Sequence, residues 1–314
     1  MPDPSAGPPV VAVVGATATG KSDLALALAE RLGGEVVNAD AMQLYRGMDI
    51  GTAKLTLEEQ RGVAHHQLDV LDVNEEASVA AYQRCSRADL EAIRVRGGQP
   101  VVVGGSGLYV RAALDELDIP PTDPAVRERL QAELDEQGVA ALRARLLERD
   151  PVAAAAIEPR NGRRIVRALE VVELTGRAFS ATMPTRRYLL PTVMLGLAVD
   201  RPTLDRRIDL RVARMWRAGL LDEVAALLAR GLRDGRTAGK ALGYREAVAQ
   251  LDGRLTADEA QEETARATRR YARRQESWFR ADPRVVWLPA QDGSSTDLVE
   301  RALAAVRGAE RMTP

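Results

Sequence analysis

The stretch Gly15-Ala-Thr-Ala-Thr-Gly20-Lys21-Ser22 constrains this chain more than any other, because it has the pattern GxxxxGK[ST]. An apolar run, Val10 to Val14, comes directly before it, and a leucine-rich helical pattern that ends at Gly33 follows it. A strand that leads through a glycine-rich turn into a helix directs several backbone N–H groups and the positive end of the helix dipole to one point. We therefore predict a phosphate-binding loop formed by Gly15, Ala16, Thr17, Ala18, Thr19, Gly20, Lys21 and Ser22.

Two side chains add chemistry to the backbone of this loop. Lys21 supplies a cation, and the Ser22 hydroxyl is placed to hold Mg2+ against the same phosphates. The alternative is an ordinary strand-turn-helix link with an incidental lysine. The loop leaves open which phosphorylated ligand it holds and what is done with that ligand.

Length and composition are those of a soluble globular protein. A chain of 314 residues with 46% hydrophobic residues can bury one large core, or one core and a smaller domain. No apolar run approaches the roughly 20 residues of a membrane span, and Met1 to Pro9 lacks the basic and apolar parts of a signal peptide. We therefore expect a cytoplasmic protein with no membrane partner, and a disordered lead-in at Met1 to Pro9.

Cysteine and histidine are too rare for several kinds of site. The single cysteine, Cys85, excludes an intrachain disulfide and a zinc site of the cysteine type, and we expect it to be a small core residue. His65 and His66 are the only histidines, which leaves little from which to build a histidine-based triad.

The net charge of -1 hides a segregation of charge along the chain. Between Arg160 and Arg280 there are 25 Lys and Arg residues and 15 Asp and Glu residues. A basic surface that binds a polyanion such as nucleic acid would have this composition. An arginine-rich set of helices whose cations pair with acids on the helix faces would have it as well, and the charge count does not separate the two.

Asp40 is the first candidate for a catalytic group. It follows a short expected strand, Glu35 to Asn38, and ligand-handling residues of a parallel α/β sheet lie just past the carboxyl ends of strands. A carboxylate there can act as a general base or as an outer-shell partner of Mg2+. The alternative is a helix N-cap or turn residue.

A later expected strand, Pro100 to Val103, ends in Gly104 and Gly105. In P-loop proteins that hydrolyse nucleoside triphosphates, such a strand usually ends in an aspartate that orders Mg2+ and the attacking water. Glycines let a backbone or a ligand come close, but they cannot hold a metal. Between the two strands we expect a short extended piece at Leu68 to Val73 and a helix from Ser78 to about Arg96.

From about residue 117 the pattern becomes entirely helical. Asp123 and Pro124 are typical of a helix N-cap and first position, and helices are expected at 124–137, 139–149, 151–157 and 161–175. We therefore predict an α/β fold in two parts. Residues 1–116 and 186–314 form a P-loop core whose parallel sheet is flanked by helices, and residues 117–185 form an all-helical insertion.

The core resumes with a strand at 192–199 and two long helices. On the first, Thr203 to Ala218, Arg211 falls at the edge of the apolar arc, so its partner is either a protein carboxylate or a phosphate at the loop. The second begins at the capping box of Thr256 and carries several arginines beside Tyr271, Gln275 and Trp278. Those three side chains favour core packing over a base-stacking surface. A last strand is expected at 285–288 and a closing helix at 295–307.

Together these stretches resemble the tRNA dimethylallyltransferases, also called tRNA isopentenyltransferases, over nearly the whole chain. The matching stretches are GATATGKS at 15–22, DAMQLYRGMDIGTAK at 40–54, GGSGLYV at 104–110, RRIVRALEVVELTG at 163–176, the helix of Arg211 followed by GLLDEV, KALGYRE at 240–246 and RRQESWFR at 273–280. The chain departs from the family at Ala41, where Ser is usual, and at Ser106, where Thr is commoner.

The resemblance implies transfer of a dimethylallyl group from dimethylallyl diphosphate to the exocyclic amine of the adenosine next to the anticodon on its 3′ side. It implies Mg2+ as cofactor, a monomer, and a flipped adenine. Lys21 and Arg211 would stabilise the leaving diphosphate and Asp40 would take the proton of the amine. The implied contacts to the tRNA anticodon loop are Asp40, Ala41, Met42, Gln43, Ser106, Arg127, Arg163, Arg164, Arg167, Lys240 and Arg245.

Three other functions share part of this pattern. An ATP-dependent kinase of a small metabolite would have the loop and an aspartate base, but the basic helices and the absent acid after Val103 argue against it. A prenyltransferase that acts on free AMP or ADP would not need the arginine-rich insertion. An RNA-binding adaptor with a relic loop would not need Lys21, Ser22 and Asp40 to be intact.

Overall fold

The computed structural model describes residues 7–182, 186–290 and 295–310, and it divides into two compact units. The first unit comprises the chain up to Leu114 and again from Tyr188, and the second is Asp115–Arg187. The insertion expected at 117–185 falls within the second unit. Residues 1–6 of the expected lead-in and residues 183–185 lie outside the described residues.

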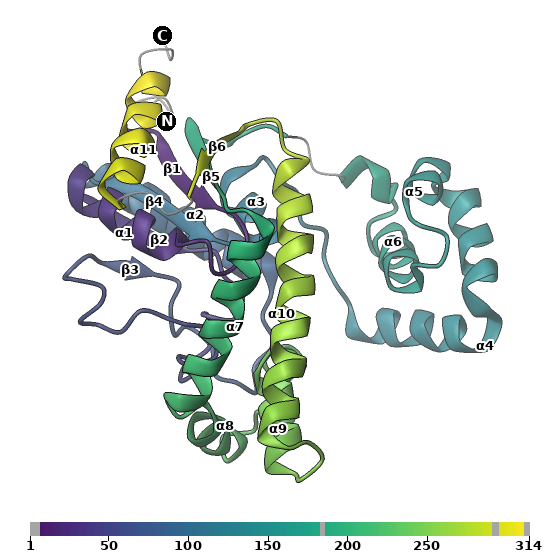
Figure 1. Ribbon diagram of the computed structural model, residues 1–314. Helices are drawn as coiled ribbons and strands as arrows, with labels where there is room; N and C mark the ends of the chain where they lie inside the picture. Colours follow the sequence, from purple (N-terminus) through teal and green to yellow (C-terminus); the bar gives the residue numbers. More distant parts are fainter. Residues whose placement is uncertain (1–6, 183–185, 291–294, 311–314) are drawn as a thin grey trace. The chain divides into compact units, whose positions relative to one another are not determined.

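A parallel sheet of six strands forms the centre of the first unit (Figure 1). The strand order is β3-β2-β4-β1-β5-β6. The strands are β1 (Val10–Val14), β2 (Gly34–Asn38), β3 (His65–His66), β4 (Gln99–Gly104), β5 (Thr192–Ala198) and β6 (Val285–Pro289). All five residues of β1 are fully buried, as expected of a central strand with helices on both faces. The α/β fold with a parallel sheet is confirmed.

Helices of the first unit pack on this sheet and extend beyond it. They are α1 (Lys21–Leu32), α2 (Val79–Val95), α3 (Gly107–Leu114), α7 (Arg201–Arg217), α8 (Leu220–Leu228), α9 (Tyr244–Leu251), α10 (Ala257–Arg280) and α11 (Ser295–Glu310). Leu24 and Leu28 of α1 share an apolar cluster with Val299 and Leu303 of α11 and with the strands. The long helices α7 and α10 pack together, and Leu204, Ile208 and Ala272 are buried there with Ala16 of the predicted loop. This contact brings two arginine-bearing helices to the end of β1.

The secondary-structure elements of the second unit, in its described part, are helical. It contains α4 (Pro124–Arg149), α5 (Pro151–Ala156), α6 (Gly162–Thr175) and a short 3-10 turn (Phe179–Thr182). Asp123 accepts hydrogen bonds from two N–H groups of the first turn of α4, as its N-cap position predicts. The two helices expected at 124–137 and 139–149 are the two arms of α4, which meet at Gly138, where the backbone is not helical (φ 80°, ψ 166°).

Two expectations about the region before β4 are wrong. Cys85 is exposed, because the buried stripe of α2 runs through Tyr82, Ser86, Leu90 and Ile93 and leaves position 85 on the outer side. The extended piece expected at 68–73 is reduced to a single bridge between Leu71 and Tyr45. The edge strand beside β2, on the side away from β4, is β3, which lies a few residues earlier.

No helix among the described residues is both long enough and apolar enough to cross a bilayer.

Candidate functional site

The loop between β1 and α1 forms as the sequence predicts. Gly20 has a φ of 90° and caps α1 without a side-chain hydrogen bond, so the first N–H groups of the helix stay available to an anion. The Thr19 hydroxyl donates to the carbonyl of Ala16 (2.8 Å), and the Lys21 ammonium donates to the same carbonyl (2.7 Å). Lys21 therefore folds back over the loop. Phosphate binding by residues 15–22 stays a prediction.

The surroundings of Lys21 shift its pKa in opposite directions. Burial lowers the pKa of Lys21 to about 8, while the Asp40 carboxylate opposes this shift and Arg211 adds to it. Burial also lowers the pKa of Arg211, and Asp40 again acts in the opposite sense. One carboxylate thus acts on both cations, so the three groups belong to one electrostatic site, into which an anionic ligand would bring compensating charge.

Asp40 lies directly past β2, at the position that the sequence predicts. The buried amide of Asn38 accepts from the N–H of Asp40 (2.9 Å) and donates to its carbonyl (3.0 Å). The Oδ1 atom of Asp40 accepts from the N–H of Met42 (2.9 Å), whereas its Oδ2 atom accepts no hydrogen bond from a described residue. One carboxylate oxygen of Asp40 therefore stabilises the local turn. The other oxygen is available to accept a proton or to bind a ligand.

Arg211 reaches the loop from α7. Its guanidinium donates to the Thr17 hydroxyl (3.1 Å) and to the carbonyl of Thr52 (3.0 Å). No carboxylate of the described residues forms an ion pair with it. Of the two partners open to Arg211, a carboxylate within ion-pair distance is not found in the described chain, although Asp40 acts on it at longer range; a phosphate at the loop stays a prediction.

The glycine turn after β4 lies beside the same loop and Asp40. A Cβ atom at Gly104 would lie 2.3 Å from the carbonyl oxygen of Ala39, and one at Gly105 would lie 2.2 Å from the amide nitrogen of Gln275. Position 104 is closed to a side chain by backbone, whereas a side chain at position 105 would have to displace Gln275. The hydroxyl of Ser106 accepts from the N–H of Ala41 (3.3 Å). Burial raises the pKa of Tyr271, and Ser106 opposes this shift.

A magnesium ion fits the donors that these residues present. No group of three or more His, Cys, Asp and Glu side chains in the described chain could hold a metal. Binding of Mg2+ by the Ser22 hydroxyl, with phosphate oxygens and water completing the shell, stays a prediction. Mg2+ is usually bound in this way, with few protein ligands.

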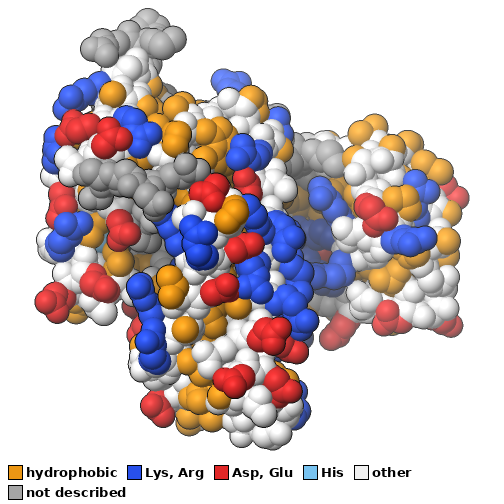
Figure 2. All heavy atoms as spheres, viewed as in Figure 1, with side chains coloured by type: hydrophobic (Ala, Val, Ile, Leu, Met, Phe, Trp, Pro, Cys, Tyr) orange, Lys and Arg blue, Asp and Glu red, His pale blue; other side chains and the backbone are white. Residues whose placement is uncertain are grey.

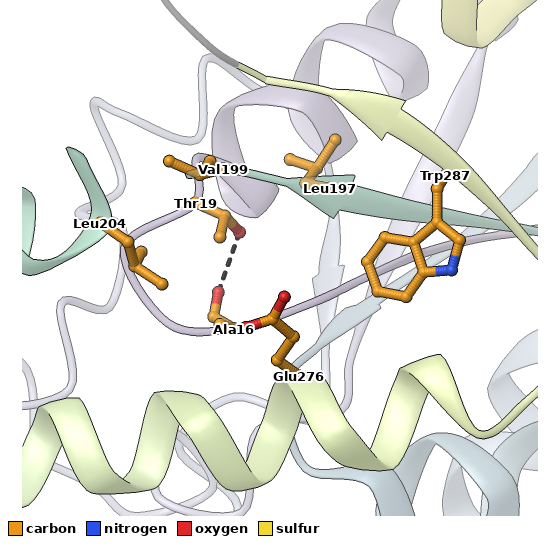
Figure 3. A pocket seen from close by; sticks show the side chains of 7 residues that line it. All are labelled: Ala16, Thr19, Leu197, Val199, Leu204, Glu276 and Trp287. Atoms are coloured by element: carbon orange, nitrogen blue, oxygen red, sulfur yellow. Dashed lines mark hydrogen bonds between the residues drawn. The ribbon is translucent and has the colours of Figure 1, made fainter. Parts of the chain in front are cut away.

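A small pocket beside the loop is mainly apolar (Figure 3). It is lined by Ala16, Thr19, Leu197, Val199, Leu204, Glu276 and Trp287. Five of these seven side chains are hydrophobic, and the Thr19 hydroxyl is already bonded to Ala16. Lys21, Asp40 and Arg211 do not line it, so the charged groups act elsewhere.

Comparison with known proteins agrees with this geometry. A family model described as IPP transferase matches residues 43–282. The chain belongs to the IPP transferase family. A tRNA dimethylallyltransferase of Kineococcus radiotolerans is 64% identical over 302 residues, which cover 94% of this chain and 95% of that protein.

Solved structures support the same assignment. The full-length tRNA isopentenylpyrophosphate transferase of Bacillus halodurans has a TM-score of 0.71 and 40% identity, with 97% of this chain and 98% of that chain covered. A eukaryotic dimethylallyltransferase described as acting on tRNA has a TM-score of 0.81 and 27% identity, with coverages of 98% and 80%. The resemblance noted from the sequence motifs is confirmed, and with it the P-loop type of core.

The segment 40–54 of this IPP transferase is held by a carboxylate that sequence reasoning assigned no role. Glu223 of α8 accepts from the backbone N–H groups of Asp49 (3.1 Å), Ile50 (2.7 Å) and Gly51 (3.3 Å), and from the Tyr244 hydroxyl (2.6 Å). The sequence does not show that Glu223 accepts from three consecutive backbone N–H groups of a distant loop. The motif GLLDEV contains Glu223 but gives no sign of this contact.

Two further contacts complete the segment. The buried Lys54 pairs with Asp49 and Asp69, both at 2.6 Å. The amide of Gln43 donates to the carbonyl of Thr52 (3.2 Å), which also receives Arg211. The predicted residues Asp40 to Gln43 are thus connected through the backbone of Thr52 to the arginine at the loop.

The second unit holds four arginines that the family resemblance assigns to RNA. Arg127 (2.7 Å) and Arg167 (2.8 Å) both pair with Glu170, a fully buried carboxylate that also accepts from the N–H of Asp123 (3.0 Å). Burial favours the neutral acid, but the hydrogen bonds from Arg167, Arg127 and Asp123 hold the pKa of Glu170 below its ordinary value. Arg127 and Arg167 therefore have internal partners, whereas Arg163 and Arg164 are exposed and pair with no described carboxylate.

The other two predicted RNA contacts lie in the first unit, around the start of α9. Lys240 is exposed, and Arg245 pairs with the buried Glu246 (2.5 Å). Glu246 also accepts from the N–H of Gly243 (2.9 Å) at the start of the helix. Arg245 thus has a structural partner, and Lys240 has a free ammonium within the described chain.

Proposed function

We propose that this IPP transferase moves a dimethylallyl group from dimethylallyl diphosphate to the exocyclic amine of the adenosine on the 3′ side of the tRNA anticodon. The observation that carries the proposal is the arrangement of Asp40 with Lys21 and Arg211. Two cations stand at a phosphate-binding loop, and a carboxylate with an unengaged oxygen acts on both of them. The names of its relatives point to the same reaction.

The donor would bind through its diphosphate. The N–H groups at the start of α1, the Lys21 ammonium and the Arg211 guanidinium would surround the phosphate oxygens. These groups interact more strongly with the diphosphate as negative charge develops on it, so they favour the transition state over the bound substrate. Mg2+, held against the phosphates by the Ser22 hydroxyl, would neutralise part of the same charge.

The transfer needs one proton acceptor. The adenine amine attacks the first carbon of the dimethylallyl group, the bond from this carbon to the diphosphate oxygen breaks, and a carbon–nitrogen bond forms. The proton released by the amine passes to Oδ2 of Asp40, and diphosphate leaves with the electron pair of the broken bond. A carboxylate positioned by Asn38 and Met42 supplies this general base.

The ATP-dependent kinase is the weaker interpretation. The turn after β4 has no room for a side chain at Gly104, and a side chain at Gly105 would have to displace Gln275, so the turn is not built to carry the carboxylate that orders the metal and nucleophile of a phosphoryl transfer. Free AMP or ADP as acceptor is disfavoured by the names of the relatives, which specify tRNA.

The RNA would be held by exposed cations as well as by residues at the loop. Arg163, Arg164 and Lys240 are exposed, and Ser106 with Ala41 to Gln43 would surround the flipped base. Arg127, Arg167 and Arg245 would contribute positive potential while keeping their internal pairs. We further propose that the protein works as a monomer in the cytoplasm.

One experiment separates these functions. The protein is incubated with unmodified tRNA and either labelled dimethylallyl diphosphate or ATP labelled in its terminal phosphate. We expect label on the RNA from the prenyl donor alone, at the adenosine beside the anticodon. Label from ATP on RNA or on a small metabolite, with none from the prenyl donor, would overturn the proposal.

A further inference from the structure

Gln275 joins the phosphate-binding loop to the glycine turn. Its Oε1 atom accepts from the N–H of Thr17 (2.9 Å), and its amide nitrogen donates to the carbonyl of Gly105 (2.9 Å). The side chain comes from α10 and is 5% exposed. A buried amide that uses both ends in this way fixes the separation of the two backbones that it connects.

We propose that Gln275 is a positioning residue for the donor diphosphate. It acts through Thr17, which is held from two sides: Gln275 takes its N–H and Arg211 binds its hydroxyl. Thr17, the loop residue that the Arg211 guanidinium contacts, is therefore held by α10 and α7 together. Without Gln275, the N–H of Thr17 has no acceptor and the loop is free to move away from Arg211 and from the Ser106 turn.

The close packing at Gly105 supports this role. A Cβ atom at this glycine would lie 2.2 Å from the amide nitrogen of Gln275 and 3.2 Å from the carbonyl oxygen of Gly15. The side chain of Gln275 therefore fills the space between the two loops. A side chain at position 105 would displace it without removing the amide, which gives an independent way to break the same contact.

The consequence is a division of labour within α10. The exposed arginines of this helix contribute positive charge. Gln275 instead positions the backbone of the loop, and in this proposal it touches neither the donor nor the RNA. Its loss should weaken donor binding and leave RNA binding unchanged. The inference rests on the proposed function, because it takes the loop to be the diphosphate site.

The test uses Gln275→Met, which keeps the volume and removes both hydrogen bonds, and Gln250→Met as a matched control. Gln250 accepts from the indole N–H of Trp216 (2.8 Å), so its replacement also removes a side-chain amide contact. Binding of inorganic pyrophosphate with Mg2+ is measured by calorimetry without RNA. We expect Q275M to lose affinity by on the order of tenfold or more, because small displacements of a binding group cost this much. Q250M should bind like the wild type.

The second measurement compares the effect of the substitution on the KM for dimethylallyl diphosphate with its effect on the KM for tRNA. In Q275M the KM for dimethylallyl diphosphate should rise with the loss of pyrophosphate affinity, while the KM for tRNA stays the same. A general loss of structure would raise both. Gly105→Ala should have the same effect as Q275M, and the double variant should be no worse than either single one. If the melting temperature shows that Q275M does not fold, the pyrophosphate affinity of G105A tests the same contact.

Three results would overturn the inference. They are wild-type pyrophosphate affinity in folded Q275M or G105A, an equal loss in Q250M, and a parallel rise of both KM values. A wild-type protein that transfers no prenyl group to tRNA would instead refute the proposed function, and the pyrophosphate measurement would still report on Gln275.

Discussion

The two oxygens of Asp40 have different tasks. Oδ1 accepts the N–H of Met42, and Oδ2 has no partner in the described chain. In Asp40→Asn one oxygen can still accept from Met42, but the side chain can no longer take a proton. We expect the rate of prenyl transfer to fall by about 10²- to 10⁴-fold, with RNA binding nearly unchanged. Single-turnover transfer and filter binding measure the two effects, and a comparable loss in both would exclude a general base.

The state of Lys21 sets the pH range in which the donor binds. Burial lowers the pKa of Lys21 to about 8, so in the free protein it loses its charge above that pH. A diphosphate favours the charged form, so its affinity should fall as pH rises above about 8, by up to about tenfold per pH unit. Pyrophosphate titrations of the wild type and of Lys21→Arg, which stays charged, measure this. Identical slopes for both proteins would show that Lys21 is not the titrating group.

The side chains of the site differ in how far the sequence predicts them. The loop and Asp40 follow from local order, since each comes directly after a strand. The sequence leaves the partner of Arg211 open, because a helix arc shows that an arginine turns inward but not what it meets. Gln275 belongs to a stripe for which core packing is favoured, and it is buried. Trp278 of the same stripe is 47% exposed, so the stripe divides between inside and outside.

Among the elements, the segment 40–54 depends most on a distant helix. Glu223→Gln keeps the size of the side chain but presents N–H groups to the backbone N–H groups of residues 49–51. We expect a loss of about 1–3 kcal/mol in the free energy of unfolding. Weaker pyrophosphate binding should accompany it, because the Thr52 carbonyl no longer positions Arg211. Urea unfolding and calorimetry measure the two.

Tyr244→Phe is the control for this change. It removes only the hydroxyl that donates to Glu223 and should cost about 1 kcal/mol. Its pyrophosphate affinity should match that of the wild type. Should Y244F lose as much affinity as E223Q, the backbone of residues 49–51 would not be what Glu223 controls.

Elements defined by local signals are the ones that the sequence predicts best. β1, α1 and the capped helices α2, α4 and α10 lie where their turns and caps place them. β3 escapes prediction because it has two residues and forms only by pairing with β2. The prediction for Cys85 is wrong because the general tendency of cysteine to be buried does not say on which face of a helix it lies, and the buried stripe of α2 passes beside it.

For the molecule as a whole, charge should govern RNA affinity. Lys and Arg side chains gather along α10 (Figure 2), where Arg270 and Arg273 are exposed and pair with no described carboxylate. Replacing both by Ala should weaken tRNA binding. It should also reduce the slope of log affinity against log salt by about 0.7 to 0.9 for each phosphate that the variant no longer neutralises. Arg31→Ala, at an arginine paired with Glu300, is the control. An unchanged slope in the double variant would place the RNA elsewhere.

The basic region that the sequence predicts between residues 160 and 280 thus has two kinds of members. Arg167, like Arg127 of the same unit, is paired with Glu170, in line with the interpretation that arginines meet acids within the protein. Arg270 and Arg273 have no such partner in the described chain. A charge count cannot make this distinction, because it depends on which side chains a fold brings within reach of a buried acid.

Helix α10 carries Gln275 on its buried side and, among the described residues, arginines without a carboxylate partner on its exposed side. A helix that contacts the donor site on one side and the RNA on the other would couple the two ligands, and such coupling is reciprocal. Any bending of α10 that a bound anticodon stem imposes would reach the prenyl donor. The donor would then change the affinity for the nucleic acid by the same factor.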